Sequence, residues 1–381
     1  MKNIIYCILG FCPLLCMGQG MGQQTFGDGI KLTAADSSFS MKFSARFQTL
    51  YDGSLNLDTD EWSDAMMIRR TRLKFDGFAY DPRLVYKLEL SVSNRDNGQV
   101  IPEGNNAANI VLDAVLKYNF SPGWYLWFGQ TKLPGNRERV ISSQELQFVD
   151  RSALNSNFTL DRGVGIQLRH EHNLGNGVLR EIGSISMGDG RNLTIDNVGG
   201  YEYTGRIEYL PFGEFTNDGD YFGSDLEREE SPKLSLAVSY DYNAHATRAQ
   251  GFRGDFLEPH KDLKTFFIDA MFKYKGFSSM LEYADKSSEG SPETPDGVFY
   301  TGRGINFQMG YLFPGNFEIA GRYTSIHPDN ISGDEDFSEL TLGLSRYIVG
   351  HSLKVQSDIT HINNDVSPDE MRFRFQVELS F

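Results

Sequence analysis

The stretch MRFRFQVELSF, residues 371–381, alternates apolar and polar side chains without a break. Successive side chains of a β-strand point to opposite faces, so this stretch has one apolar face and one charged face. A strand between lipid and water needs that arrangement, whereas a soluble edge strand rarely carries so many outward aromatic residues. The apolar face consists of Met371, Phe373, Phe375, Val377, Leu379 and Phe381. The stretch therefore predicts a strand of a transmembrane antiparallel β-barrel.

The same alternation recurs along the chain and predicts sixteen strands. Most are close to the roughly 9–11 residues that a tilted membrane strand needs. The predicted strands are 39–51, 66–80, 84–94, 110–120, 124–132, 164–173, 178–188, 200–210, 233–243, 264–275, 277–286, 303–313, 316–326, 337–347, 351–362 and 371–381.

The connections between the predicted strands alternate in length. Those after even-numbered strands are short, such as 81–83 and 121–123, whereas those after odd-numbered strands are long and polar, such as 95–109 and 133–163. Short turns on one rim and long loops on the other are typical of an outer-membrane barrel, and they place both barrel ends on the periplasmic rim. The connection 211–232 is long where a short turn is expected, so either the count slips there or that periplasmic connection is elaborated.

Connection lengths and composition argue against other classes of protein. A soluble β-sandwich would have short connections at both ends of its strands, without this one-sided asymmetry. Beyond the N-terminus no stretch reaches 18 consecutive apolar residues, which excludes a helical membrane protein. The net charge of −15 argues against a nucleic-acid partner. The content of 28 Phe, 18 Tyr and 39 Gly residues suits many twisted strands with aromatic girdles.

The N-terminus predicts export. A basic start is followed by a short apolar stretch and then by Gly18 and Gly20, which indicates a signal peptide at 1–18 with cleavage near 18–20. A short periplasmic segment at 19–38 and the barrel at 39–381 complete the expected organisation. A lipoprotein is disfavoured because Leu15, not a small residue, precedes Cys16. The only other cysteines, Cys7 and Cys12, also lie in the leader, so the mature chain has no thiol for catalysis or metal binding.

Four segments carry a resemblance to a known family. They are RRTRLKFDGFAYDPRLVYKLELSVSNRD (69–96), WFGQTKLPGNRERVISSQELQFVDRSALN (127–155), DRGVGIQLRH (161–170) and GGYEYTGRIEYLPFGEF (199–215). The chain resembles the phosphate-selective porin O and P family, in the branch found in Bacteroidetes-type bacteria. The resemblance implies a sixteen-stranded outer-membrane barrel, a homotrimer, an inward-folded loop that narrows the pore, and lumen arginines that serve anion uptake.

Charged residues on the expected inward faces nearly balance, but basic ones gather on three strands that become neighbours when the barrel closes. This basic wall consists of Arg46, Arg70, Arg72, Arg372 and Arg374. Arginine suits oxyanions because its planar fork donates two parallel hydrogen bonds and keeps its charge. The alternative is that these arginines pair with lumen carboxylates, such as Asp76 and Glu378, and only fill the wall.

The longest loop, 133–163, mixes charges of both signs with apolar side chains. Folding into the lumen would bury Leu146, Phe148, Leu154 and Phe158 and form a constriction, where charge sets selectivity. The loop would then add Arg137, Arg139 and Arg151 to the candidate anion-binding residues. The alternative is that it caps a neighbouring subunit.

Catalysis finds little support in the sequence. His170 and His172 share one strand face, but no nearby carboxylate spacing completes a metal site, and no G-x-S-x-G motif is present. We therefore expect a non-enzymatic porin, without cofactor or metal, for passive diffusion of small hydrophilic solutes, with a preference for inorganic anions such as phosphate. The alternative is a surface receptor or adhesin acting through its extracellular loops. Expected partners are outer-membrane lipid, two further copies of the chain, and the barrel-assembly machinery through the C-terminal strand ending in Phe381.

Overall fold

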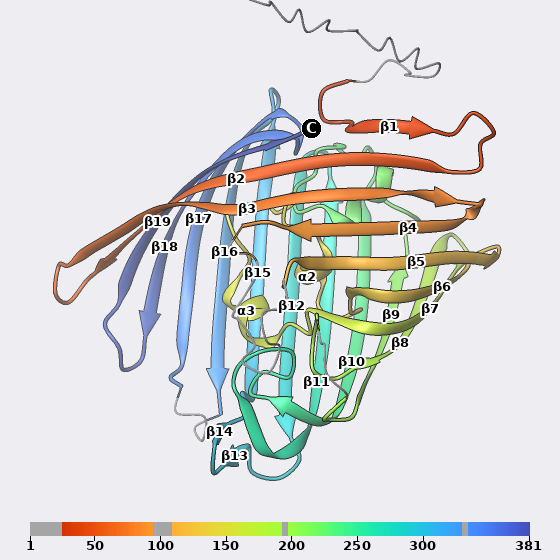
Figure 1. Ribbon diagram of the computed structural model, residues 1–381. Coiled ribbons are helices and arrows are strands. Elements are labelled where there is room, and N and C mark those ends of the chain that lie inside the picture. Colours follow the sequence, from red (N-terminus) through yellow and green to blue (C-terminus); the bar gives the residue numbers. More distant parts are fainter. Residues whose placement is uncertain (1–24, 94–95, 97–108, 193–196, 330–333) are drawn as a thin grey trace, which may run out of the picture.

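The computed structural model describes residues 25–93, 96, 109–192, 197–329 and 334–381 (Figure 1). The predicted signal peptide at 1–18, its cleavage site and its cysteines lie outside these residues and stay predictions. Sixteen strands form a closed ring. They are β2 (Ser40–Asn56), β3 (Trp62–Ala79), β4 (Asp81–Ser91), β5 (Val111–Ser121), β6 (Trp124–Lys132), β7 (Arg162–Leu174), β8 (Gly177–Met187), β9 (Tyr201–Leu210), β10 (Lys233–Arg248), β11 (Phe256–Tyr274), β12 (Phe277–Ser288), β15 (Gly302–Phe313), β16 (Phe317–Pro328), β17 (Phe337–Val349), β18 (Leu353–Asn364) and β19 (Glu370–Ser380).

Each strand of the ring pairs antiparallel with its neighbours in sequence, and β19 closes the ring by pairing with β2. All sixteen predicted strands are present, so the predicted fold class is confirmed. The short turns lie on the rim that also holds β1 and the C-terminus, at the top and right of Figure 1; we call it the short-turn rim. The opposite edge, the long-loop rim, holds the ribbon of β13 (Glu293–Thr294) and β14 (Gly297–Val298).

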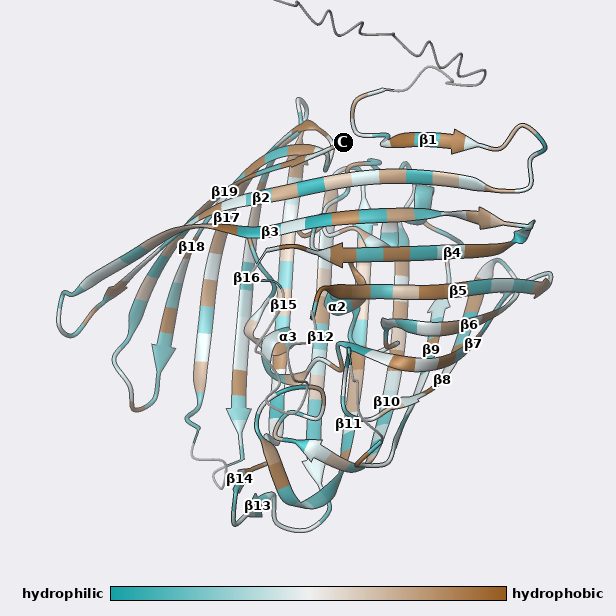
Figure 2. Cartoon of the chain, in the orientation of Figure 1, coloured by the Kyte–Doolittle hydropathy of each residue, from teal (hydrophilic) through white to brown (hydrophobic). Residues whose placement is uncertain are grey.

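Outward and inward faces differ as the alternation predicts. On β15, Ile305, Phe307 and Met309 point outward and are exposed, whereas Asn306 and Gln308 point inward and are buried. Apolar and polar bands accordingly alternate along the strands in Figure 2. Among the described residues, no helix has both the length and the apolar character needed to cross a membrane.

Three elements were not predicted. The first, β1 (Ile30–Thr33), falls in the expected periplasmic segment 19–38 and pairs with Ser40–Phe43 at the start of β2. The other two are β13 and β14, which form a small ribbon inside one long connection. The count of barrel strands is unchanged. The strand β1 pairs with β2 beyond the end of β19, and β13 and β14 pair with each other in a separate sheet.

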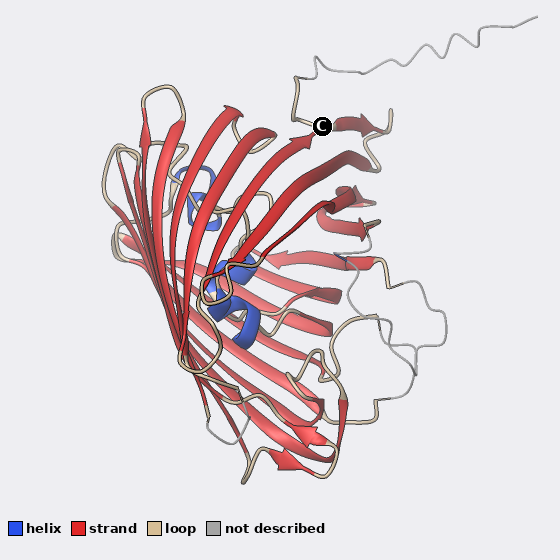
Figure 3. Ribbon diagram, turned by 90° about the vertical axis from the view of Figure 1, so that its left-hand side faces the viewer, coloured by secondary structure: helices blue, strands red, loops and turns tan. Residues whose placement is uncertain are grey.

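The loop 133–161, which we call the constriction loop, lies inside the ring, as predicted. Its helices α2 (Arg137–Val140) and α3 (Ala153–Phe158) are surrounded by strands in Figure 3. Leu154 and Phe158 are fully buried in a cluster with the inward side chains Phe267 and Ile326.

Two inward glycines make room for the constriction loop. A Cβ atom added to Gly304 would lie 2.9 Å from the ring of Phe158. A Cβ atom added to Gly343 would lie 2.9 Å from the ring of Phe148. Both distances are too short for a side chain, so the wall is shaped to fit the loop.

The connection 211–232 also enters the lumen, from the short-turn rim, and contains the 3-10 segment η2 (Thr216–Tyr221). Lys273 on β11 donates hydrogen bonds from Nζ to the carbonyl oxygens of Gly219 and Ser224, both at 2.7 Å. The amide of Gly223 donates to the carbonyl of Glu145 in the constriction loop at 2.8 Å. The strand count therefore does not slip here: this connection is elaborated, and it meets the constriction loop inside the barrel.

Arg137 joins the two inward connections to the wall. Its guanidinium is fully buried and contacts Glu208 at 2.7 Å, Asp269 at 3.2 Å and Asp220 at 3.3 Å. These carboxylates come from β9, β11 and the connection 211–232. Because a buried charge is costly unless paired, the side chain fixes α2 to one side of the ring.

We expect Phe307→Arg to lower the free energy of unfolding in lipid vesicles by about 2–4 kcal/mol, because it places a charge on the lipid face near mid-strand. Phe313→Arg, at the end of the same strand and face, should cost about 0–1 kcal/mol. Urea titration measures both. An equal loss in the free energy of unfolding for the two variants would show that Phe307 does not lie nearer the middle of the membrane than Phe313.

We expect Arg137→Met to lower the free energy of unfolding by roughly 3–5 kcal/mol, because three buried carboxylates lose their common cation. It should also speed proteolysis of the constriction loop in the folded barrel. Arg83→Met is the control, since Arg83 lies near the start of β4 with its side chain 59% exposed. A loop that stays as resistant as in the wild type would show that Arg137 does not hold it.

Candidate functional site

A cavity of about 1140 Å³ lies between the constriction loop and the wall, toward the long-loop rim. Among the described residues it is lined by twelve arginines and six carboxylates, without a lysine. The arginines are Arg69, Arg70, Arg72, Arg139, Arg151, Arg162, Arg191, Arg248, Arg253, Arg322, Arg372 and Arg374. The carboxylates are Asp96, Asp150, Asp161, Asp189, Asp255 and Glu339. The lining thus carries a clear excess of positive charge.

A β-bulge brings two consecutive arginines of β3 to the same carboxylate. Gln48 pairs with Arg70 and the next residue of β2 pairs with Ile68, which leaves Arg69 as the extra residue. Arg69 donates to Asp150 Oδ2 at 2.7 Å, and Arg70 donates to Asp150 Oδ1 at 2.8 Å. Strict alternation would have turned Arg69 outward, so the alternation does not indicate its place in the cavity.

The other strand arginines of the predicted site also line the cavity and also have carboxylate partners. Arg72 contacts Asp96 at 2.6 Å and Glu89 at 2.9 Å. Arg374 contacts Asp358 at 2.7 Å. Arg372 lies 3.4 Å from Asp52 and its side chain is 38% exposed, so it is the most open of these arginines.

The constriction loop contributes Arg139 and Arg151. Arg139 forms an ion pair with Asp161. Arg151 donates to the carbonyl oxygens of Glu138 at 3.0 Å and Ile141 at 2.7 Å, which holds the turn after α2.

Arg46 and Arg137, also predicted for the site, do not line the cavity. Arg137 lies in the ion-pair cluster described above. Arg46 on β2 donates to Glu378 on β19 at 2.9 Å and to Ser143 in the constriction loop at 2.6 Å. The contacts of these two arginines fit the alternative given above, in which lumen arginines pair with carboxylates and fill the wall.

Arg322 on β16 was expected to point inward but was not assigned to the site. It donates to the carbonyl oxygen of Asp150 at 2.9 Å and lies over the ring of Phe148. The remaining cavity arginines come from connections or strand ends, namely Arg162, Arg191, Arg248 and Arg253. These four arginines were not among the residues predicted for the site.

The carboxylate of Asp150 keeps its charge at neutral pH. Burial alone would raise the pKa of Asp150, but Arg70 and Arg69 outweigh it and hold that pKa well below its usual range. The carboxylate therefore stays ionised and its contacts are true ion pairs. Nε of Arg70 and Nε of Arg322 have no hydrogen-bond partner among the described residues. Both atoms are shielded from solvent, so they do not offer open donors to a passing anion.

Comparison with known proteins agrees with this geometry. The family model for phosphate-selective porin O and P matches residues 41–217. No curated protein matches the chain significantly.

Several solved structures share the fold at low identity. A loop-deletion mutant of OmpT, an outer membrane protein of Vibrio cholerae, has a TM-score of 0.58 at 10% identity, over 90% of this chain and 100% of that one. The outer membrane channel DcaP of Acinetobacter baumannii has a TM-score of 0.58 at 14% identity, over 92% and 99%. The anion-selective porin from Comamonas acidovorans has a TM-score of 0.55 at 10% identity, over 90% and 100%.

The likeness to these structures supports the barrel fold. The family match covers the N-terminal half of the barrel, residues 41–217. The predicted localisation, the outer membrane of a Gram-negative bacterium, is thereby confirmed. Over residues 41–217 the chain is similar to the phosphate-selective porin O and P family.

Proposed function

We propose that this chain is a passive diffusion channel for small hydrophilic solutes that favours small anions such as phosphate. The observation that carries the proposal is the excess of arginines over carboxylates around the cavity next to the constriction loop. A narrow, partly dehydrated passage has a lower effective dielectric constant than bulk water, so a net charge on its lining acts strongly on a passing ion.

Pairing within the wall reduces this effect but does not remove it. Two arginines share Asp150, and Arg72 and Arg70 both lie near Asp96. Shared carboxylates leave the lining with more positive than negative charge. The pairs also hold the guanidinium groups in place, which keeps the donors preorganised for an oxyanion.

The acidic surface does not contradict an anion preference. The chain carries a net charge of −15, with acidic runs in long loops such as 327–336. Exposed charges are screened within a Debye length of about 8 Å at physiological salt. Charges inside the barrel are screened less, so the cavity outweighs the mouth in selecting ions.

We expect the wild-type channel in a planar bilayer to be anion-selective in a salt gradient. Arg69→Gln combined with Arg372→Gln should lower the anion-to-cation permeability ratio by about two- to fivefold, since a unit charge about 8 Å away contributes roughly 0.5 kcal/mol in water. Asp150 keeps Arg70 as partner and Arg372 is partly exposed, so the fold should survive this change. The reversal potential measures the ratio.

The matched control removes the same charge outside the cavity, with Arg83→Gln near the start of β4 and Arg303→Gln on the outward face of β15. It should leave the reversal potential unchanged. A cation-selective wild type, or an equal shift in the control, would remove the proposed role of the cavity. A folded barrel without conductance steps would favour the surface receptor or adhesin instead.

We propose further that the barrel forms a homotrimer through the wall made by β2 to β6, and that assembly machinery recognises β19 and the terminal Phe381. Outward apolar residues on that wall, such as Leu116 and Phe128, can pack between subunits. On β19, Phe373 and Phe375 present the apolar outward face that such machinery would read.

We expect Leu116→Cys to yield cross-linked dimers with a short bis-maleimide in native outer membranes. Residues 17–381 contain no cysteine, so the introduced thiol is unique after leader removal. Leu342→Cys, equally outward but on β17, is the control and should stay monomeric. Equal amounts of dimer from both positions, or only monomer in native mass spectrometry, would refute the proposed interface.

A further inference from the structure

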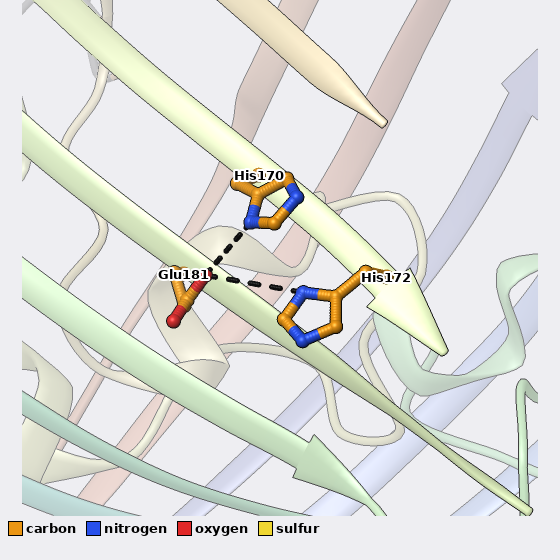
Figure 4. Close-up of side chains that lie close together, drawn as sticks. All are labelled: His170, His172 and Glu181. Carbon is orange, nitrogen blue, oxygen red and sulfur yellow. Dashed lines mark hydrogen bonds and ion pairs between the residues drawn. The ribbon is translucent and has the colours of Figure 1, made fainter. Parts of the chain in front are cut away.

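Three side chains that the channel does not use lie together on the outside of the barrel. His170 and His172 on β7 and Glu181 on β8 point toward one another in Figure 4. His170 is directly opposite Glu181 in the strand pairing, and His172 is two residues further along β7. Diagonal neighbours of this kind are within reach of long side chains.

The cluster faces away from the lumen. Leu168, two residues before His170, is exposed on the outward face, whereas Gln167 and Arg169 belong to the inward one. The strand β7 ends at Leu174, so the histidines lie close to the short-turn rim. The side chains of His170, His172 and Glu181 are 21%, 38% and 46% exposed, which leaves the cluster accessible from solvent at that edge.

The geometry is that of a partly formed coordination site. Nδ1 of His170 lies 2.8 Å, and Nδ1 of His172 4.0 Å, from the same oxygen, Oε2 of Glu181. One ligand atom from each residue lies within 4.8 Å of the other two. Nδ1 of His172 is shielded from solvent and has no hydrogen-bond partner among the described residues. A shielded nitrogen without a partner, aimed at a carboxylate, suits a metal ligand.

Neighbouring rings restrict the imidazoles. Trp124 stacks on His170 with ring centroids 4.0 Å apart, and the two imidazole rings stack at 4.6 Å. Ligands already held near their bound orientation lose less conformational entropy when a metal binds. The stack therefore favours binding over an arrangement of freely rotating side chains.

We propose that His170, His172 and Glu181 bind one divalent metal ion of the zinc class at the outer face of the barrel. Two imidazoles and one carboxylate are ligands that Zn²⁺ accepts in tetrahedral sites, and the fourth position remains for water. The sequence shows the two histidines on one strand face. The third ligand comes from the next strand, which is why local spacing did not reveal it.

The site is independent of the channel, because its residues face outward and none lines the cavity. We expect untagged protein in detergent to bind one Zn²⁺ per chain in isothermal titration calorimetry. His170→Ala, His172→Ala and Glu181→Gln should each weaken binding by about tenfold or more. Conductance in planar bilayers should be the same for these variants as for the wild type.

The control is His245→Ala, since His245 lies 3.8 Å from Asp262 but has no second histidine beside it and is 73% exposed. It should bind Zn²⁺ as the wild type does. Heat-dependent migration in gels verifies that each variant is folded. A wild type without saturable binding at micromolar Zn²⁺, or equal losses in the control, would overturn the proposal.

A second measurement locates the ion. Zn²⁺ should slow modification of His170 and His172 by diethyl pyrocarbonate, followed by peptide mass spectrometry, and leave the rate at His245 unchanged. The same protection at all three histidines would show unspecific binding and refute the site.

Discussion

The structure depends on one constraint: within lipid, every backbone amide and carbonyl must find a partner inside the protein. Sixteen antiparallel strands meet it only because β19 pairs with β2 over eleven residue pairs and leaves no free edge between them. Closure fixes the register of every strand, and the register decides which side chains face lipid. A slip of one residue on β19 would turn Phe373 and Phe375 inward and Arg374 into the bilayer.

The interior follows from the same constraint. Two connections enter the lumen from opposite rims, and their own polar backbone must be paired there as well. The wall supplies carboxylates for Arg137, Nζ of Lys273 for the connection 211–232, and apolar side chains around Phe158. What remains is a cavity at one side of the barrel, where arginines of β3 and β19 gather beside the constriction loop.

Much of this could be predicted from the sequence, because a membrane strand shows its register in its own alternation. All sixteen strands were predicted in this way. The inward course of the constriction loop was predicted from its length and its apolar side chains. The bulge that admits Arg69, the wall partners of Arg137, and the third ligand near His170 could not be predicted. Each depends on contacts between residues far apart in sequence, which local periodicity does not encode.

The contacts of Ser143 have a consequence for assembly. Arg46 on β2 donates to its hydroxyl group, Gln48 on β2 donates to its carbonyl group, and both side chains also hold Glu378 on β19. The strands β2 and β19, which close the ring, are thus joined by their backbone pairing and also by side chains that contact the constriction loop. We therefore expect closure of the barrel and seating of the loop to be coupled: a chain whose loop remains outside would lack the contacts that Ser143 makes with Arg46 and Gln48.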